Sequence, residues 1–141
     1  MAVKRQSART FGYSGTPLIS KLGIKPGARM QFVSEPKELA GLLGDLPEGA
    51  RIASRGTLDF AMLFVKTESD LRKKFAPLRD RLESNGMLWV SWPKKASGVA
   101  TDVTEGVVRT FGLESGLVDV KVCAVDDTWS GLKFVRRLKD R

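Results

Sequence analysis

A run of apolar residues ends abruptly in two lysines and a Ser-Gly pair in the segment GMLWVSWPKKASGVATD, residues 86–102. Ammonium groups, a hydroxyl and backbone N–H groups freed by glycine are together suited to bind an anion such as phosphate, particularly ahead of a helix. Pro93 would stiffen the chain here and so fix the direction of the lysines. The candidate ligand-binding residues of this loop are Lys94, Lys95, Ser97, Gly98 and Thr101.

A plainer interpretation of residues 94–101 is a rigid surface connection whose two lysines are solvated. Asp102 already places a negative charge at the start of the helix predicted to follow, where it would compete with a bound anion. The pattern also differs from a P-loop, because the lysines precede the glycine. Both interpretations stay open.

Two other segments carry polar groups that could line the same site. GYSGTPL, residues 12–18, precedes a predicted helix and could either close over a ligand or cap the helix and dock the tail. Its candidate ligand-binding residues are Tyr13, Ser14, Gly15 and Thr16. DDTWSG, residues 126–131, could supply acid–base groups, although its composition is typical of a turn held by side-chain hydrogen bonds. Its secondary candidates are Asp126, Asp127 and Trp129.

The residue types that are missing exclude several chemistries. The chain has no histidine, and histidine is both the commonest general base and the commonest metal ligand. The single cysteine, Cys123, lies in an apolar run and is predicted to be a core residue. We therefore expect no disulfide and no metal site. The three tryptophans are predicted to pack in the core rather than to stack on a ligand.

The formal net charge of +8 is concentrated at the two ends of the chain. Residues 1–10 contribute +3 and residues 132–141 contribute +4, which leaves +1 for the 121 residues between them. Basic ends can contact nucleic-acid phosphates, but they also serve solubility alone. Nucleic acid is therefore a conceivable partner without being the favoured one, and an anionic small molecule, a protein partner or a homodimer stay open.

The bulk composition is that of one globular domain, with 141 residues of which 42% are hydrophobic and 28% charged. No apolar run approaches the roughly 20 residues of a membrane span, and the basic N-terminus lacks the apolar block of a signal peptide. We expect a cytoplasmic protein with a flexible basic tail over 1–10, a single domain over 11–138 and a basic end over 139–141.

Strand and helix patterns alternate along the chain. The predicted strands cover residues 29–33, 50–54, 60–65, 87–92, 117–125 and 132–138, and the predicted helices cover 16–23, 35–43, 69–82 and 102–112. Pro77 predicts a kink or a break in the third helix, and Asn85-Gly86 predicts its end. Asp102 and Glu105 have the spacing of a capping box. The short connection between the last two strands requires an antiparallel pair. These patterns predict a single three-layer α/β domain with a mainly parallel sheet.

Three segments resemble the Rossmann-like methyltransferases that bind S-adenosylmethionine. The segment LGIKPGARMQFV is similar to the part of these enzymes that enters the first strand. FAMLFV, the helix after it and SNGMLWVSWPK are similar to their middle strand, helix and next strand. The last segment, GLVDVKVCAVDDTWSGLKFVRR, is similar to their antiparallel last pair of strands. The likeness implies the strand order 2-1-3-4-6-5 with strand 6 antiparallel. More specifically, GYSGTPL, WVSWPKKASG, TD and LVDVKVCAVDDTWSGLKFV resemble a bacterial family catalogued as domain of unknown function 3052, which implies no particular activity.

The departures from the methyltransferases bear on function. In that family a glycine-rich turn follows the first strand, whereas this chain reads FVSEPK at 32–37. The second strand of that family is followed by a carboxylate, whereas here it ends in Ala53-Ser54-Arg55. Side chains in that turn would block a nucleoside, and Pro36 has no N–H to donate. We therefore expect a non-catalytic binding or regulatory domain without a cofactor. The alternatives are an atypical methyltransferase-like group-transfer enzyme and a non-specific nucleic-acid binder.

Overall fold

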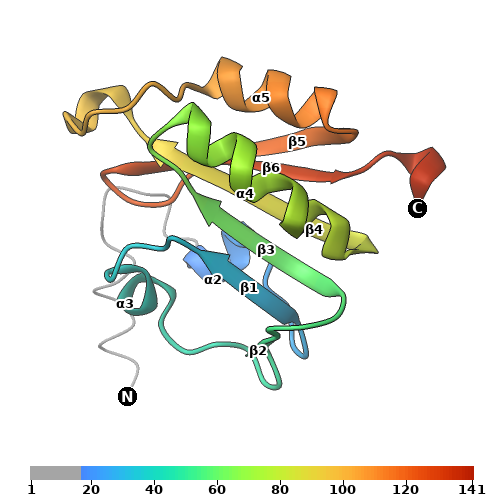
Figure 1. The fold of residues 1–141 in the computed structure, drawn as a ribbon. Coiled ribbons are helices and arrows are strands. Elements are labelled where there is room, and N and C mark those ends of the chain that lie inside the picture. The colour runs from blue at the N-terminus through green and yellow to red at the C-terminus, as the bar shows by residue number, and fades with distance from the viewer. Residues whose placement is uncertain (1–16) are drawn as a thin grey trace.

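Six strands form one sheet in the order β2-β1-β3-β4-β6-β5 in the computed structural model, which describes residues 17–141 (Figure 1). The strands are β1 (Arg29–Val33), β2 (Arg51–Ile52), β3 (Leu58–Phe64), β4 (Leu82–Pro93), β5 (Leu117–Ala124) and β6 (Trp129–Arg136). The strands from β2 to β4 are parallel, and β6 is antiparallel to both β4 and β5. The predicted fold class and strand order are confirmed.

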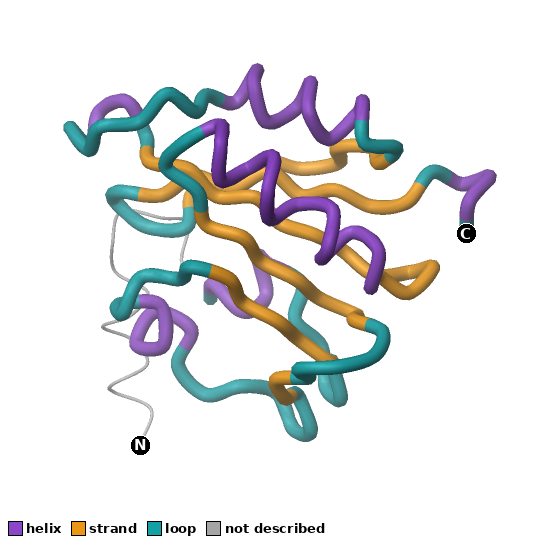
Figure 2. The backbone as a smooth tube through the Cα atoms, in the orientation of Figure 1, coloured by secondary structure: helices purple, strands orange, loops and turns teal. Residues whose placement is uncertain are grey.

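Helices cover both faces of the sheet, which gives the predicted three layers (Figure 2). The helices are α2 (Leu18–Leu22), α3 (Leu39–Leu43), α4 (Glu68–Arg81) and α5 (Glu105–Glu114), with 3-10 turns at Lys95–Ser97 and Leu138–Asp140. No helix within residues 17–141 is long and apolar enough to cross a membrane.

The core consists of two apolar clusters, one on each face of the sheet. Side chains of β3 and β4 that point toward α4 and α5 form the first cluster, and those that point toward α2 and α3 form the second. Trp89, Trp92 and Trp129 are all buried, as predicted, and Trp89 Nε1 donates to the Leu22 carbonyl at 2.9 Å. Cys123 is also buried in the second cluster. The sheet is therefore rigid beneath its surface loops.

Helix α4 is continuous through Pro77, so the predicted division into two helical pieces is wrong. Thr67 begins the helix, because its hydroxyl accepts from the Asp70 N–H at 3.0 Å. Leu71 and Phe75 before the proline, and Leu78 after it, are all buried in one cluster. This packing offsets the hydrogen bond that proline cannot make.

The helix ends earlier than predicted, because β4 begins at Leu82, directly after Arg81. Asn85 and Gly86 therefore lie inside the strand and do not terminate the helix. A Cβ on Gly86 would lie 2.7 Å from the Leu58 carbonyl oxygen, at the place where the pairing of β3 with β4 shifts register. The glycine serves this close approach of two backbones.

Two elements in the first half of the chain, α3 and β2, are shorter than predicted. Helix α3 has five residues, since residues 35–38 form a turn around Pro36. Strand β2 has only two residues, Arg51–Ile52, and no helix separates it from β3. Because β2 is so short, a five-residue connection is enough to return the chain to the start of β3.

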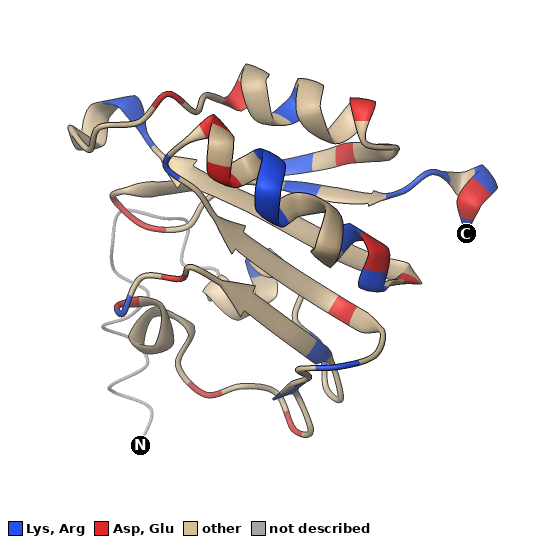
Figure 3. Cartoon of the chain, viewed as in Figure 1, with Lys and Arg blue, Asp and Glu red and all other residues tan. Residues whose placement is uncertain are grey.

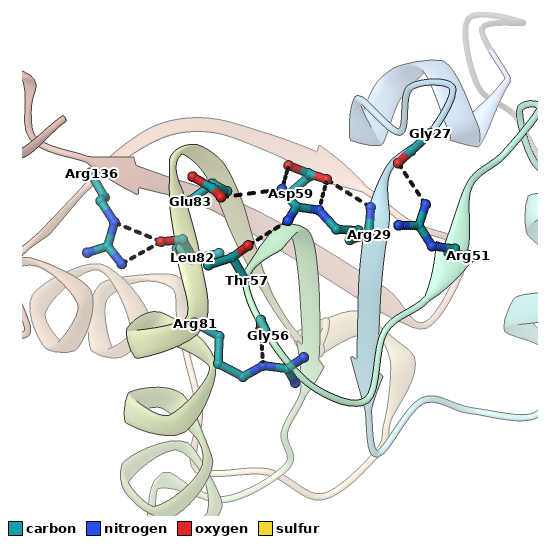
Figure 4. A network of polar contacts seen from close by, with 10 residues as sticks. All are labelled: Gly27, Arg29, Arg51, Gly56, Thr57, Asp59, Arg81, Leu82, Glu83 and Arg136. Carbon is teal, nitrogen blue, oxygen red and sulfur yellow. Dashed lines mark hydrogen bonds and ion pairs between the residues drawn. The ribbon is translucent and has the colours of Figure 1, made fainter.

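Arginine side chains hold the amino edge of the sheet together (Figure 4). Arg29 on β1 donates to both carboxylate oxygens of Asp59 on β3, at 2.9 and 3.0 Å, and also reaches Glu83 on β4 at 3.4 Å. Arg136 on β6 donates to the carbonyls of Arg79 and Leu82 where α4 passes into β4. These contacts join neighbouring strands at the amino edge of the sheet. A ligand site is therefore sought at the carboxyl edge.

Candidate functional site

The loops that follow β1, β3, β4 and β5 meet at the carboxyl edge of the sheet, on the left in Figure 1. Ligands of open α/β sheets bind at this edge. A hollow of about 520 Å³ opens between the loops. We call it the edge hollow, and its lining residues are Pro36, Glu38, Leu42, Lys66, Val99, Asp126, Asp127, Thr128 and Trp129.

The turn between β5 and β6 forms one wall of the edge hollow. Asp126 Oδ1 accepts from the backbone N–H groups of Thr128 at 2.8 Å and Trp129 at 2.7 Å, so its carboxylate holds the turn, as its composition predicted. The Trp129 ring packs edge-on against Phe64, with ring centroids 5.1 Å apart. This wall is therefore fixed in place by a hydrogen-bonded carboxylate and a buried indole.

Two other carboxylates of the edge hollow, Glu38 and Asp127, have exposed side chains. Neither side chain accepts a hydrogen bond from another residue within 17–141. Lys66, directly after β3, adds an exposed ammonium group. The edge hollow thus combines two carboxylates that have no partner within the described residues and a cation with apolar surface from Leu42, Val99 and Trp129.

A second hollow, of about 450 Å³, lies beneath α3 on the outer part of the sheet. Its lining is mainly apolar, with Glu35 and Lys37 at its rim and β1, β2 and α3 supplying Met30, Phe32, Leu39, Ala40, Leu43, Leu46 and Ile52. Residues 35–38 therefore separate two hollows.

The prediction that side chains fill the space after β1 is wrong. Ser34 adopts a left-handed backbone with φ of 60°, and its hydroxyl accepts from Lys74 Nζ on α4 at 3.0 Å. A left-handed serine turns the chain as glycine would, at some cost in strain. Its side chain is directed to α4 and lines neither hollow. Glycine is thus not required at this position for space to open beside the loop.

The loop after β4 satisfies most of its own polar groups. Ser97 Oγ donates to the Lys94 carbonyl at 2.7 Å and accepts from the Val99 N–H at 3.1 Å, and the Gly98 N–H reaches the Lys95 carbonyl. Thr101 Oγ1 donates to the Lys66 carbonyl at 2.7 Å. Neither Lys94 nor Lys95 lines the edge hollow. The backbone of the loop after β4 is partly blue, for Lys or Arg, at the upper left of Figure 3. Anion binding by Lys94 and Lys95 stays a prediction.

The capping-box spacing predicted that Asp102 begins α5, and this prediction is wrong. Its carboxylate accepts from the Glu68 N–H at 2.8 Å and so caps α4, while Thr104 caps α5 by accepting from the Val107 N–H at 3.2 Å. Glu105 instead pairs with Arg109 on the same helix at 2.7 Å.

Sequence reasoning identified the Asp126–Trp129 side of the edge hollow and missed the other. Glu38, Leu42 and Lys66 were not predicted as site residues. Lys66 could have been found, since it is the first residue after the buried run FAMLFV at 60–65 and parallel strands end at one edge. Tyr13, Ser14, Gly15 and Thr16 lie outside the described residues, so their role stays a prediction. Within 17–141, no cluster of three or more Cys, Asp or Glu residues could hold a metal ion.

Comparison with known proteins gives matches among solved structures. An S-adenosylmethionine-dependent methyltransferase from Aquifex aeolicus superposes with a TM-score of 0.59 at 12% identity, covering 94% of this chain and 91% of that one. Fibrillarin from Aeropyrum pernix, solved with bound S-adenosylmethionine, gives 0.57 at 15% identity, with 92% and 73% covered. Magnesium protoporphyrin IX methyltransferase from Synechocystis PCC 6803, also with bound S-adenosylmethionine, gives 0.52 at 14% identity, with 85% and 74% covered.

This chain has the fold of S-adenosylmethionine-dependent methyltransferases. No family model matches it, and no curated protein does. The expectation of a non-catalytic binding or regulatory domain is wrong, because the Aquifex and Synechocystis structures of this fold are methyltransferases and the space thought to be blocked is open. Of the interpretations drawn from the sequence, the methyltransferase-like one agrees with these findings.

Proposed function

We propose that this protein transfers a methyl group from S-adenosylmethionine and that the edge hollow holds the cofactor. The observation that carries the proposal is the position of that hollow, at the carboxyl edge of a methyltransferase-like sheet. Its volume of about 520 Å³ lies within the usual range of small-molecule sites, about 300–1,000 Å³. Fibrillarin and the protoporphyrin methyltransferase, which share the fold, bind S-adenosylmethionine in their solved structures.

The residues that line the edge hollow suit the chemistry of this cofactor. S-adenosylmethionine has a sulfonium cation, an ammonium group and ribose hydroxyls, all of which a carboxylate can neutralise or accept from. Glu38 and Asp127 are the two lining carboxylates without partners within 17–141, so they are the residues that would hold these groups. Lys66 would pair with the carboxylate of the cofactor, and Trp129 and Leu42 would contact its apolar surface.

When bound, S-adenosylmethionine supplies an electrophilic methyl group. The protein's part is to align that group with a nucleophile and to exclude water from the approach. Asp126 contributes indirectly, because its two backbone hydrogen bonds fix the turn that carries Asp127 and Trp129. Asp127, the carboxylate on that turn without a partner within residues 17–141, would hold the cofactor there.

Isothermal titration with S-adenosylmethionine and with S-adenosylhomocysteine tests the proposal. We expect saturable binding of both, and we expect Asp127→Asn and Glu38→Gln each to raise Kd by about tenfold, because each removes a charged acceptor. Glu114→Gln is the matched control, since it removes one carboxylate from α5, outside the edge hollow. If wild-type protein binds neither compound at millimolar concentration, the proposal is wrong.

We also propose that the chain belongs to the bacterial family catalogued as domain of unknown function 3052. The proposal rests on WVSWPKKASG at 89–98 and LVDVKVCAVDDTWSGLKFV at 117–135. The second motif contains the turn that lines the edge hollow, and the first motif ends directly before Val99, which also lines it. If relatives share the proposed chemistry, they should keep acceptor side chains at the positions of Glu38 and Asp127.

A further inference from the structure

Lysine side chains gather on the sheet face that carries α2, over the β5–β6 hairpin. The strand register places Lys121 on β5 opposite Lys133 on β6. Lys133 is in turn paired with Trp89, whose side chain is buried against Leu22 of α2, so the lysines project toward the same face. We call Lys25, Lys121 and Lys133 the basic cluster.

Backbone contacts tie the basic cluster to α2 and to the turn after it. Lys121 Nζ donates to the carbonyl of Lys21 at 3.0 Å, and Lys21 Nζ donates to the carbonyl of Ala124 at 3.3 Å. A Cβ placed on Gly23 would lie 4.0 Å from Lys133 Nζ, so that ammonium group sits close beside the end of α2. Segments about 100 residues apart in the sequence thus bring their positive charges together.

The electrostatic environment of Lys133 is unfavourable for its own charge. Partial burial, and then the positive charges of Lys121 and Lys25, hold the pKa of Lys133 below its usual value. Like charges directly opposite on paired strands also destabilise a sheet. No ion pair joins Lys25, Lys121 or Lys133 to a carboxylate among residues 17–141. The cluster is therefore an electropositive surface without a paired carboxylate in the part of the chain that the structure describes.

We infer that the basic cluster binds the phosphate backbone of a nucleic acid. A row of phosphates would supply the missing negative charge to all three lysines at once, and counterion release would drive the association. Lysine is depleted from protein–protein interfaces, whereas lysine–phosphate contacts dominate non-specific nucleic-acid affinity, so the composition favours this partner over an acidic protein. The inference does not depend on the proposed methyl transfer, because it concerns a different surface.

Fluorescence anisotropy with a labelled 20-nucleotide single-stranded RNA, at 50 to 200 mM KCl, tests this assignment. We expect Lys121→Gln/Lys133→Gln to weaken binding by about tenfold at 50 mM KCl. Its slope of log affinity against log salt should fall by about 1.4, because each phosphate of a single strand that a lysine no longer neutralises reduces the slope by about 0.7. Lys73→Gln/Lys139→Gln, which removes the same charge from α4 and from the C-terminal turn, should change both quantities much less.

Further outcomes make the experiment decisive. The Lys73→Gln/Lys139→Gln variant should keep the thermal midpoint of the wild type, and the cluster variant should slightly exceed that midpoint, because a repulsive pair has been removed. Equal losses in the two variants would show that only total charge matters and would overturn the inference. Absence of RNA binding at 50 mM KCl would overturn it as well, and so would binding of polyglutamate at the same affinity as RNA.

Discussion

Asp102 caps a helix that begins 34 residues before it, because its carboxylate accepts from the Glu68 N–H at 2.8 Å. The preceding residue also anchors this loop, because Thr101 Oγ1 donates to the Lys66 carbonyl at 2.7 Å. The connections after β3 and after β4 are therefore joined side chain to backbone at the rim of the edge hollow, which both Lys66 and Val99 line. The position of one loop depends on the other.

Asp102→Ala should lower the free energy of unfolding by about 1 kcal/mol, the usual loss when a helix N-cap is removed. Asp102→Asn keeps an oxygen acceptor and should cost less. Urea denaturation of the two variants beside the wild type measures the difference. If alanine and asparagine cost the same, the hydrogen bond to Glu68 is not what stabilises this rim.

Hydrophobic periodicity was enough to predict the main strands, because their apolar runs are unmistakable, whereas the strand order came from the resemblance to methyltransferases. The runs at 60–65 and 87–92 are buried on both faces, and the hairpin at the end has too short a turn for any arrangement but antiparallel. Local signals failed where a distant contact decides the outcome. Pro77 lies within a helix because buried side chains pack on both sides of it. Gly86 has the sequence signature of a helix end, but in the structure it lies against the backbone carbonyl of Leu58.

The candidate site was harder to predict than the fold. Asp126 and Asp127 stand out because two acidic residues lie just before a tryptophan, and Lys66 directly follows the apolar run at 60–65, but Glu38 has no distinctive neighbours in the sequence. Only the strand order brings the ends of β1, β3 and β5 together around one hollow. The absence of glycine after β1 was misleading, since Ser34 adopts the left-handed conformation itself.

The ion pair between Arg29 and Asp59 predicts a pH dependence of stability. The hydrogen bonds and charge of Arg29 hold the pKa of Asp59 below its ordinary value, with Arg51 adding a smaller attraction. Because the folded pKa is the lower one, the contribution of Asp59 is fully present above the unfolded value of about 3.9 and is lost as the pH falls through the folded pKa. Glu83 also contacts Arg29, at 3.4 Å, and shares this arginine.

Thermal midpoints of the wild type and Asp59→Asn, measured between pH 7 and pH 2, check this dependence. The midpoint difference should be largest at neutral pH and should shrink below about pH 4. When Arg29→Gln is present in both proteins, the midpoint difference caused by Asp59→Asn at neutral pH should be smaller. The reason is that Arg29→Gln removes the main cause of the lowered Asp59 pKa. A midpoint difference that stays constant down to pH 2 would contradict the assignment.

Two glycines of α5 should respond in opposite ways to the same substitution. A Cβ on Gly112 would overlap the ring of Phe134, which is fully buried against the sheet, whereas a Cβ on Gly106 would meet nothing closer than the Thr104 hydroxyl at 3.9 Å. Gly112→Ala should therefore destabilise by about 1–3 kcal/mol through overpacking. Gly106→Ala should stabilise by about 0.5–1 kcal/mol through helix propensity.

Chemical denaturation of the two single variants and the double variant measures both effects. The two positions lie at different ends of the helix, so their free-energy changes should add. Stabilisation by Gly112→Ala would mean that Phe134 does not pack against α5 as described.

Ser91 and Ser97 differ in how their hydroxyls are satisfied, and this difference predicts opposite changes in stability. Ser91 on β4 is fully buried, and its Oγ has no hydrogen-bond partner among residues 17–141, whereas Ser97 Oγ donates to the Lys94 carbonyl and accepts from the Val99 N–H. A buried hydroxyl without a partner costs desolvation free energy, so Ser91→Ala should raise the free energy of unfolding by about 1 kcal/mol. Ser97→Ala should lower it by a similar amount, because it leaves two backbone groups of the loop without their partner. Urea denaturation distinguishes the two signs, and a loss of stability in Ser91→Ala would show that its hydroxyl does have a partner in solution.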